Sequence, residues 1–353
     1  MRPGGILSIF ILGLIVGSVY CPNIATVSAK PQVFLTVKGT SITDASGRVV
    51  LLRGVSYPGY ETVGVDDYPP AHRESSYQTF AEKGFNVVRL QVSWANFEPL
   101  PGKFDWGYLS QRVNLDVTWA KEHGIYIILD MHQFDWSKRF NGNGAPDWAV
   151  QQYPPTTGGM RKAVSNFWVN QSLQNHLADV WQRIAQGYAN ETTIAGYDII
   201  NEPWLYAPNA NSTYLDAFYD RVMQSIRKVD TNHIFFLEPS NIPDANPPFK
   251  ERIVWSPHFY ANAFYQKYYP QNFTMLQADI AAKYRRYVIG YGAPMWIGEF
   301  AAFMTDGSYA EWLRDATTLF NMYNVGWAWW AFYDQGAEAH SVSDSIRLIS
   351  TSF

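Results

Sequence analysis

The segment Tyr197-Asp198-Ile199-Ile200-Asn201-Glu202-Pro203 decides how the fold is interpreted. Its first four residues form a short strand-like run that leads directly into polar residues. The same arrangement recurs along the chain, where short β-rich apolar runs are followed by polar stretches with helical spacing. No repeat of fixed period, low-complexity segment or internal linker interrupts this alternation. Strand-like runs that alternate with helical stretches predict a parallel sheet with crossover helices.

We predict eight strands in total. The first lies near Leu51 and follows a predicted β-hairpin formed by residues 33–37 and 47–52. Eight strands favour an α/β fold of the closed (β/α)8 TIM-barrel class over an open doubly wound sheet. No glycine-rich dinucleotide-binding motif follows the first strand, which weakens the open-sheet alternative further. The other predicted strands are residues 86–90, 125–129, 197–200, 234–237, 253–256, 295–297 and 326–330.

Helical spacing of apolar residues fills the intervals between these runs. Gly84 and Gly124 follow two of the predicted helices as C-terminal stops. A barrel of this length is commonly one domain, so we expect residues 30–353 to form a single catalytic domain. The predicted helices are residues 78–83, 109–122, 214–229 and 310–322, with a short last helix at 341–349.

Composition narrows the class of function. The chain has 353 residues and a net charge of −4, and a mildly acidic chain without a basic stripe argues against a nucleic-acid partner. Charged residues make up 16% of the sequence, against a typical quarter, while aromatic residues also reach 16%. These aromatic side chains either pack a large barrel core or line a groove for flat, weakly polar ligands such as sugar rings.

The N-terminal region is typical of an exported protein. Met1-Arg2 precedes an apolar stretch at residues 6–20, and Val27-Ser28-Ala29 resembles a small-residue cleavage site. The apolar stretch is shorter than the roughly 20 residues that span a bilayer. We therefore expect residues 1–29 to be a signal peptide of a secreted protein, with a retained N-terminal membrane anchor as the alternative. Cys21, the only cysteine, would be lost with the leader, which excludes a disulfide, a thiolate metal cluster and a cysteine nucleophile.

Polar side chains stand near the predicted carboxyl end of almost every strand. Active sites of (β/α)8 barrels form at these ends. Polar groups that directly follow buried apolar runs are costly unless they are paired or used. The residues are Arg89 after the second strand, Asp130 and His132-Gln133 after the third, Asn201-Glu202 after the fourth, Glu238 after the fifth, His258 and Tyr260 after the sixth, Glu299 after the seventh and Trp330 after the eighth.

Two of these residues have the chemistry of glycoside hydrolysis. Glu202 and Glu299 belong to strands on opposite sides of the barrel, so their side chains are expected to converge over the opening. One carboxyl group must donate a proton to the leaving oxygen, and the other must attack the anomeric carbon or activate water. Arg89 would lower the pKa of a neighbouring glutamate and keep it ionised.

The remaining strand-end residues would bind the sugar. Asn201, His258 and Tyr260 offer hydrogen bonds, and Trp330 offers a flat apolar face. Each residue taken singly has a structural explanation: a glutamate can cap a helix, an arginine can form a salt bridge, and a tryptophan can lie in the core. His132 and His258 could also bind a metal, although no third ligand has convincing spacing. Their occurrence together at matching strand ends favours an active site.

The series Arg89, His132, Asn201-Glu202-Pro203, His258-Phe259-Tyr260, Glu299 and Trp330 resembles the retaining glycosidases of glycoside hydrolase family 5. The resemblance extends over roughly residues 45 to 335. It implies that Glu202 is the acid/base and Glu299 the nucleophile. It also implies that Arg89 and Tyr260 lie near the nucleophile and that Trp330 stacks on the sugar, with no metal or organic cofactor.

Residues 129–133 (Leu-Asp-Met-His-Gln), 142–149 (Gly-Asn-Gly-Ala-Pro-Asp-Trp-Ala) and 166–168 (Asn-Phe-Trp), with Ser137, are similar to the endoglycoceramidase and glucosylceramidase branch of that family. This similarity implies a glycolipid substrate, and therefore a possible substrate at a membrane surface. Two features depart from the branch. Phe134 stands where Asp is usual, and little chain follows the eighth strand, which leaves no room for the β-sandwich that many members carry.

Cellulase-type activity on a glucan is therefore the competing substrate assignment. A non-catalytic carbohydrate-binding barrel and a metal-dependent barrel hydrolase are alternatives of other classes. The retaining mechanism predicts carboxyl groups about 5 to 5.5 Å apart. The sequence predicts neither the sugar, the linkage nor the oligomeric state.

Overall fold

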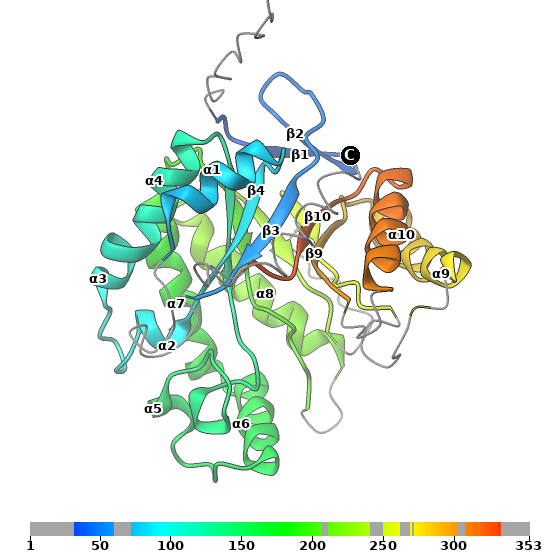
Figure 1. Cartoon of the computed structure of the whole chain (residues 1–353). Helices are drawn as coiled ribbons and strands as arrows, with labels where there is room; N and C mark the ends of the chain where they lie inside the picture. Colours follow the sequence, from blue (N-terminus) through cyan, green and yellow to red (C-terminus); the bar gives the residue numbers. More distant parts are fainter. Residues whose placement is uncertain are drawn as a thin grey trace, which may run out of the picture.

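The computed structural model describes residues 32–59, 72–206, 211–240, 250–261, 269, 272–302 and 308–332. Its centre is a barrel of eight parallel strands with helices packed outside (Figure 1). In chain order the strands are β3 (Arg53–Tyr57), β4 (Val87–Val92), β5 (Tyr126–Met131), β6 (Ile194–Asp198), β7 (Ile234–Leu237), β8 (Ile253–Trp255), β9 (Trp296–Phe300) and β10 (Gly326–Trp329).

Hydrogen bonding joins the strands in the order β8-β7-β6-β5-β4-β3-β10-β9. Two further parallel bridges, Trp255 with Met295 and Phe259 with Phe300, connect the two outer strands of this order. These bridges complete the ring, so the predicted (β/α)8 barrel is confirmed. Sheets of this kind bury both faces of their strands, and all residues of β4 and β6 are accordingly buried.

The helices follow the strands as the alternating pattern predicts. Between β7 and β8 the described residues contain no helix, and residues 241–249 lie outside the described part. The helices are α1 (Glu74–Glu82), α2 (Trp94–Phe97), α3 (Trp106–Tyr108), η2 (Leu109–Val113), α4 (Asn114–Glu122), η3 (Lys138–Phe140), α5 (Asp147–Val150), α6 (Thr157–Val169), α7 (Gln171–Tyr188), α8 (Ser212–Arg227), α9 (Phe273–Tyr284), η4 (Arg285–Gly290) and α10 (Tyr309–Met322).

Asparagine side chains mark the start of three helices. Asn170 ends α6 and accepts hydrogen bonds from the backbone N–H groups of Ser172 and Leu173 in α7. Asn211 and Asn272 cap α8 and α9 in the same way. Because the first N–H groups of a helix have no partner within it, such caps stabilise a helix by about 1 kcal/mol each.

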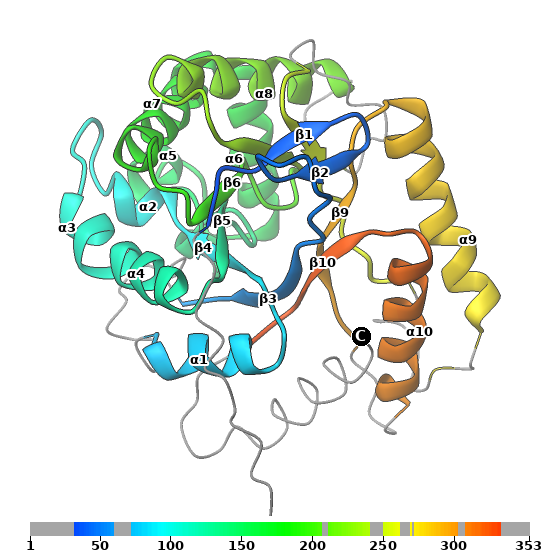
Figure 2. The same cartoon turned by 90° about the horizontal axis from the view of Figure 1, so that it is seen from above.

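A small antiparallel hairpin, β1 (Thr36–Lys38) with β2 (Ser41–Thr43), crosses the barrel at the end where the strands begin (Figure 2). Leu35 and Ile42 pack into an apolar cluster of inward-facing strand residues that includes Phe236 and Trp296. The hairpin thus closes the amino-terminal end of the barrel and leaves the carboxyl ends of the strands open for a site.

The N-terminal hairpin was predicted, but the position of its second strand was wrong. The expected residues 47–52 do not form it, because the chain reverses earlier, at Gly39 with φ +58°. A second turn follows, in which Asp44 accepts hydrogen bonds from the N–H groups of Ser46 and Arg48. Val49 then forms only a single bridge with Thr43.

Other predicted boundaries also need correction. The helix expected at 78–83 is α1 at Glu74–Glu82, and the strand expected at 295–297 is β9 at Trp296–Phe300, so Glu299 lies within its strand and not after it. The strand expected at 197–200 is β6 at Ile194–Asp198, because Ile199 and Ile200 are buried without continuing the strand. The helix expected at 109–122 is divided into a π-helical segment and α4. The predicted signal peptide at 1–29 and the last helix at 341–349 lie outside the described residues. None of the helices described is long and apolar enough to span a bilayer.

Candidate active site

The open end of the barrel gathers the polar residues that the sequence singled out. Glu202 follows β6, His258 and Tyr260 follow β8, and Glu299 lies within β9. These elements are distant in the sequence, and closure of the barrel brings their side chains to one opening. The remaining predicted residues here are Asn201 beside Glu202, His132 directly after β5 and Trp330 directly after β10.

Arg89 was predicted to end its strand. This prediction is wrong, because β4 continues through Val92. Its side chain is completely buried, and a buried guanidinium without partners would be very costly. Four carboxylates and one amide oxygen surround it. The contacts run from Nε to Asp198 (3.0 Å), from Nη1 to Glu299 (2.7 Å), and from Nη2 to Asp130 (3.0 Å), Glu238 (2.8 Å) and Asn201 (2.9 Å).

Asp198 is a member of this cluster that the sequence analysis missed. Its signal was an acidic residue inside an otherwise apolar strand-like run. Burial raises the pKa of Asp198 well above its ordinary value, and the charges of Glu238 and Asp130 add to this rise, while Arg89 opposes it. Arg89 is the counter-charge that Asp130, Asp198, Glu238 and Glu299 share.

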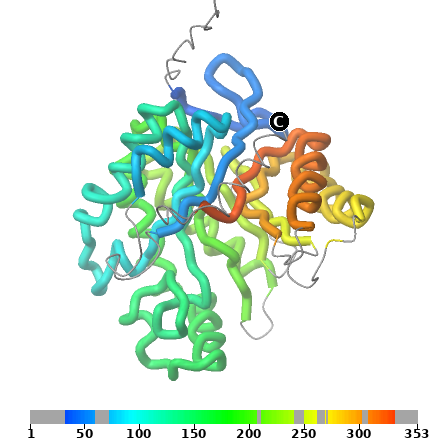
Figure 3. The backbone as a smooth tube through the Cα atoms, viewed as in Figure 1, coloured from blue at the N-terminus to red at the C-terminus, as the bar shows by residue number. Residues whose placement is uncertain are grey.

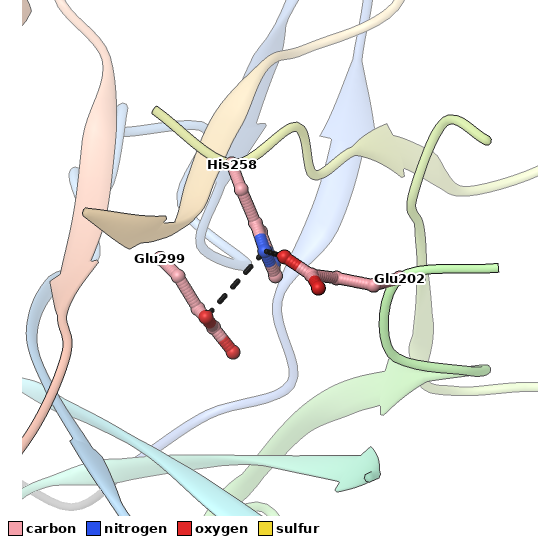
Figure 4. Close-up of side chains that lie close together, drawn as sticks. All are labelled: Glu202, His258 and Glu299. Atoms are coloured by element: carbon pink, nitrogen blue, oxygen red, sulfur yellow. Dashed lines mark hydrogen bonds and ion pairs between the residues drawn. The ribbon is translucent and has the colours of Figure 1, made fainter. Parts of the chain in front are cut away.

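The backbone of Glu202 lies in the left-handed region, with φ +41°. This conformation is uncommon for a residue with a side chain and costs about 1 to 3 kcal/mol. Two hydrogen bonds hold it: the N–H of Glu202 donates to Glu238 Oε2 at 2.7 Å, and its carbonyl accepts from Gln133 Nε2 at 3.0 Å. The turn directs the carboxyl group toward Glu299 (Figure 4).

Glu202, His258 and Glu299 converge at the opening (Figure 4). His258 Nδ1 lies 2.9 Å from Glu202 Oε1 and 3.5 Å from Glu299 Oε2. One oxygen of each carboxylate and one ring nitrogen of His258 all lie within 4.8 Å of one another. The two carboxylates therefore face a common space, and their catalytic roles remain predictions.

The pKa values of Glu202 and His258 shift in opposite directions. Burial raises the pKa of Glu202, but the hydrogen bond and charge of His258 outweigh burial, so the pKa is lowered. Burial lowers the pKa of His258, but the charges of Glu238 and Glu299 and the hydrogen bond to Glu202 raise it well above 6.5. These directions favour a proton on His258 over one on Glu202 in the free protein.

Glu299 is almost completely buried, and burial raises its pKa above 4.5. The positive charges of His258 and Arg89 lower the pKa of Glu299 but do not cancel the effect of burial. Arg89 lowers the pKa of Glu299, as expected. The net pKa of Glu299 is nevertheless raised, whereas a lowered pKa was expected. Tyr260 donates a hydrogen bond to Glu299 Oε2 at 2.8 Å. Burial and the charge of Glu299 raise the pKa of Tyr260, so it remains a donor.

Trp330 and His132 form a flat wall beside the carboxylates. Their rings are stacked, with centroids 5.3 Å apart and planes 11° apart. His132 is fixed by its Nδ1 atom, which lies 2.8 Å from Asp130 Oδ2. Such a wall offers an apolar face to a sugar ring next to the two acids.

Two groups of acidic and histidine side chains in the described part of the chain are close enough to hold a cation. One consists of Asp130, Asp198 and Glu238, whose carboxylates already surround Arg89. The other is the trio of Glu202, His258 and Glu299. Its one nitrogen and two oxygens suit zinc better than magnesium or calcium, which prefer oxygen ligands alone.

An apolar pocket of about 240 Å³ borders Glu202. It lies on the side of the barrel away from β10, the strand that precedes Trp330. Phe134 and Trp204 also line it and remain 59% and 48% exposed. The pocket thus connects the proposed acid/base with the outside surface. Its other apolar lining residues include Trp136, Met160, Val164, Trp168 and Tyr206.

A closed (β/α)8 barrel with two facing carboxylates at its mouth is an arrangement that suits glycoside hydrolysis. A family model described as Cellulase (glycosyl hydrolase family 5) matches residues 43–336. Since this match covers most of the sequence, the chain belongs to glycosyl hydrolase family 5, and it is an O-glycosyl hydrolase.

The relatives with known names include endoglycoceramidases and a beta-xylosidase. An endoglycoceramidase from Cyanea nozakii is 26% identical over 74% of this chain and 61% of that protein. A beta-xylosidase from Phanerodontia chrysosporium is 26% identical over 86% of this chain and 71% of that protein. The chain spans only half of endoglycoceramidase I from Rhodococcus hoagii, at 27% identity.

The solved structures that resemble this chain include an endogalactoceramidase and an endo-glycoceramidase. An endogalactoceramidase superimposes with a TM-score of 0.77 and 27% identity, covering 91% of this chain and 84% of that one. Endo-glycoceramidase II from Rhodococcus sp. superimposes with a TM-score of 0.69 and 26% identity, covering 82% and 74%. The resemblance to the endoglycoceramidase branch that the sequence suggested is confirmed.

Replacing Arg89 by Met should lower the free energy of unfolding by about 3 to 5 kcal/mol at neutral pH, because buried carboxylates lose their counter-charge. The loss of Arg89 raises the pKa of these carboxylates in the folded state. The penalty should therefore be largest above the raised pKa values and shrink as the pH falls through them. Urea denaturation at neutral and mildly acidic pH measures both effects.

Arg48→Met is the matched control, since the side chain of Arg48 is 73% exposed and its partner Asp44 keeps the hydrogen bonds from the N–H groups of Ser46 and residue 48. It should change the stability by less than about 1 kcal/mol. Equal losses for the two variants, or an Arg89 penalty that does not depend on pH, would contradict the counter-charge role.

Proposed function

We propose that the protein cleaves β-glycosidic bonds with retention of configuration, with Glu299 as nucleophile and Glu202 as acid/base. One observation carries this proposal: oxygens of the two carboxylates lie within 4.8 Å of each other. Retaining enzymes hold their carboxyl groups about 5 to 5.5 Å apart, whereas inverting enzymes need about 6.5 to 9.5 Å to admit a water molecule. The short separation supports the retaining mechanism.

The reaction proceeds in two displacements. Glu299 attacks the anomeric carbon, the bond from this carbon to the leaving oxygen breaks, and Glu202 transfers its proton to that oxygen. Glu202, now ionised, takes a proton from a water molecule. The water oxygen attacks the same carbon and displaces the Glu299 carboxylate, so the released sugar has its original anomeric configuration.

His258 provides the proton that Glu202 must donate. The raised pKa of His258 favours a proton on its ring, and its Nδ1 lies 2.9 Å from Glu202 Oε1. The negative charge of Glu299 is one cause of the raised pKa of His258. As Glu299 bonds to the sugar this charge disappears, which favours transfer of the proton from His258 to Glu202 and on to the leaving group.

The other residues orient the reacting groups. Arg89 and Tyr260 each bond one oxygen of Glu299 and so fix the attacking carboxylate. Asn201, His132 and Trp330 are proposed to bind the sugar ring at the same opening. Preorganised contacts of this kind contribute to catalysis because they need no rearrangement during the reaction.

The proposed substrate is a β-glycoside of a lipid, such as a glycosylceramide. Glu202 protonates the leaving oxygen, so the aglycone lies on the Glu202 side of the bond. The apolar pocket borders Glu202 and is lined by aromatic and aliphatic side chains. This lining and the endoglycoceramidase relatives support a lipid aglycone. A glucan is the second candidate, because a Cellulase/esterase from Acetivibrio thermocellus is 23% identical over 79% of the chain.

We further propose that residues 30–353 form one catalytic domain that acts outside the cell after residues 1–29 are removed. The support is the sequence of the N-terminal region, with its apolar core and small residues at 27–29. Retention of the leader as an anchor would place the same domain at a membrane.

Replacing either proposed catalytic acid should remove nearly all hydrolysis while the fold is retained. Glu202→Ala should still form a glycosyl-enzyme from an aryl glycoside whose leaving group needs no proton, and azide should rescue turnover as the β-glycosyl azide. Glu299→Ala should give no such β-product, because the nucleophile is absent. Proton NMR of the first-formed sugar should show the β-anomer for the native protein. A first-formed α-anomer would rule out retention.

The pH profile of kcat/KM should be bell-shaped. Glu299 must be ionised, and its raised pKa places the acid limb above 4.5. The alkaline limb reports loss of the proton shared by His258 and Glu202 and lies above 6.5. His258→Gln removes the group that holds this proton, so the alkaline limb should move to lower pH. His123→Gln, a remote control, should leave both limbs in place, and an unchanged alkaline limb in His258→Gln would refute the proton role.

A hydrolysis panel tests the substrate. Glucosylceramide and lactosylceramide in detergent should be cleaved, and carboxymethylcellulose should not. Trp204→Ser should lower kcat/KM for the ceramide substrates about tenfold through loss of apolar contact, with a smaller effect on an aryl glycoside. Trp106→Ser is the control, since Trp106 is 51% exposed and belongs to α3. Cleavage of cellulose alone would favour the glucan.

A further inference from the structure

A lobe formed by residues 133–170 projects from the barrel at the end where the strands end (Figures 1 and 3). It contains η3, α5 and α6 and lies between β5 and α7 in the sequence. Phe134, Met160 and Val164 of the lobe line the apolar pocket that borders Glu202. The lobe therefore stands directly beside the entrance to the proposed active site.

The charge of this lobe differs from that of the chain. Within the lobe the cations Lys138, Arg139, Arg161 and Lys162 outnumber the acids Asp135 and Asp147, although the whole chain has a net charge of −4. Arg161 and Lys162, both exposed, follow an uncharged segment at the tip of the lobe, residues 151–160. Arg161 also lies over the ring of Tyr206, 5.5 Å from its centroid, at the edge of the apolar pocket.

Exposed apolar side chains accompany these cations. Val169 is 56% exposed and lies seven residues after Lys162 in α6, so the two share one face of the helix. The neighbouring Trp168 donates a hydrogen bond from Nε1 to the carbonyl of Trp204 at 2.8 Å. This contact joins the end of α6 to the exposed Trp204, and Phe134 lies across the same pocket.

We propose that this lobe docks the protein on a lipid bilayer that carries anionic lipids. Cations next to an uncharged tip are attracted to the negative headgroups, and exposed Phe, Trp and Val side chains enter the interface. The apolar pocket then opens toward the membrane, so the aglycone of a glycolipid reaches Glu202 without crossing water. The benefit for catalysis rests on the proposed glycolipid substrate, but the docking itself does not.

Sedimentation with vesicles that contain no glycolipid tests the docking separately. The native protein should bind phosphatidylcholine vesicles with added phosphatidylglycerol more tightly than vesicles of phosphatidylcholine alone. Lys162→Glu should weaken binding to the anionic vesicles about fivefold or more. Lys83→Glu makes the same charge change at the exposed end of α1, beside the beginning of the strands, and should bind like the native protein. Both variants should hydrolyse a soluble aryl glycoside at the native rate.

Three outcomes would overturn the docking surface: no binding of the native protein to anionic vesicles, equal weakening by the two variants, or a change of oligomeric state in Lys162→Glu. The last would show that the lobe contacts a second copy of the chain. If the native protein hydrolyses glycosylceramide in detergent but does not bind vesicles, the docking proposal fails and the proposed function stands. If it binds vesicles but cleaves no glycolipid, the proposed substrate fails.

Discussion

The architecture of the site depends on one buried ion cluster, in which Arg89 holds carboxylates from several strands. Its guanidinium bonds Asp198, Glu238 and Glu299, which belong to different parts of the barrel. Burying these acids without a counter-charge would cost several kcal/mol each. The cluster also reaches both proposed catalytic acids. Glu299 bonds Arg89 directly, while the backbone of Glu202 is held by the other oxygen of Glu238. The Arg89 cluster therefore influences both the positions and the charges of Glu202 and Glu299.

The same cluster explains why the two catalytic candidates differ although both are glutamates. Glu299 is almost fully buried and has a raised pKa, whereas Glu202 is 37% exposed and has a lowered pKa through its contact with His258. The pKa shifts of the free protein therefore favour a proton on the histidine between the acids. This arrangement keeps the proton off the proposed nucleophile, Glu299, until Glu299 bonds to the sugar and loses its negative charge. Glu202 must act first as an acid and then as a base in a retaining mechanism. The neighbouring His258 can supply the proton for the first role.

The sequence predicted the barrel and every strand of the ring, because the alternation of apolar runs and helical stretches survives errors at their ends. It also predicted the hairpin but misplaced its second strand. It did not predict that β6 stops before Ile199 or that Arg89 lies inside β4. An apolar run indicates which residues are buried, but not which of them form the backbone hydrogen bonds of a strand. Asp198 was missed since an acid within a strand has no partner visible in the sequence. The net pKa shifts of Glu202 and Glu299 depend on distances and burial that only folding fixes, and the sequence supplied only the direction of single contributions.

The central claim is that Glu299 attacks the sugar while Glu202 faces it from the other side. A 2-deoxy-2-fluoro glycoside with a good leaving group slows both steps and lets the covalent intermediate accumulate. Mass spectrometry of the digested protein should then find one added fluorosugar on the peptide that contains Glu299, and none on the peptide that contains Glu202. A label on Glu202, or an intact protein with no label after inactivation, would contradict the account.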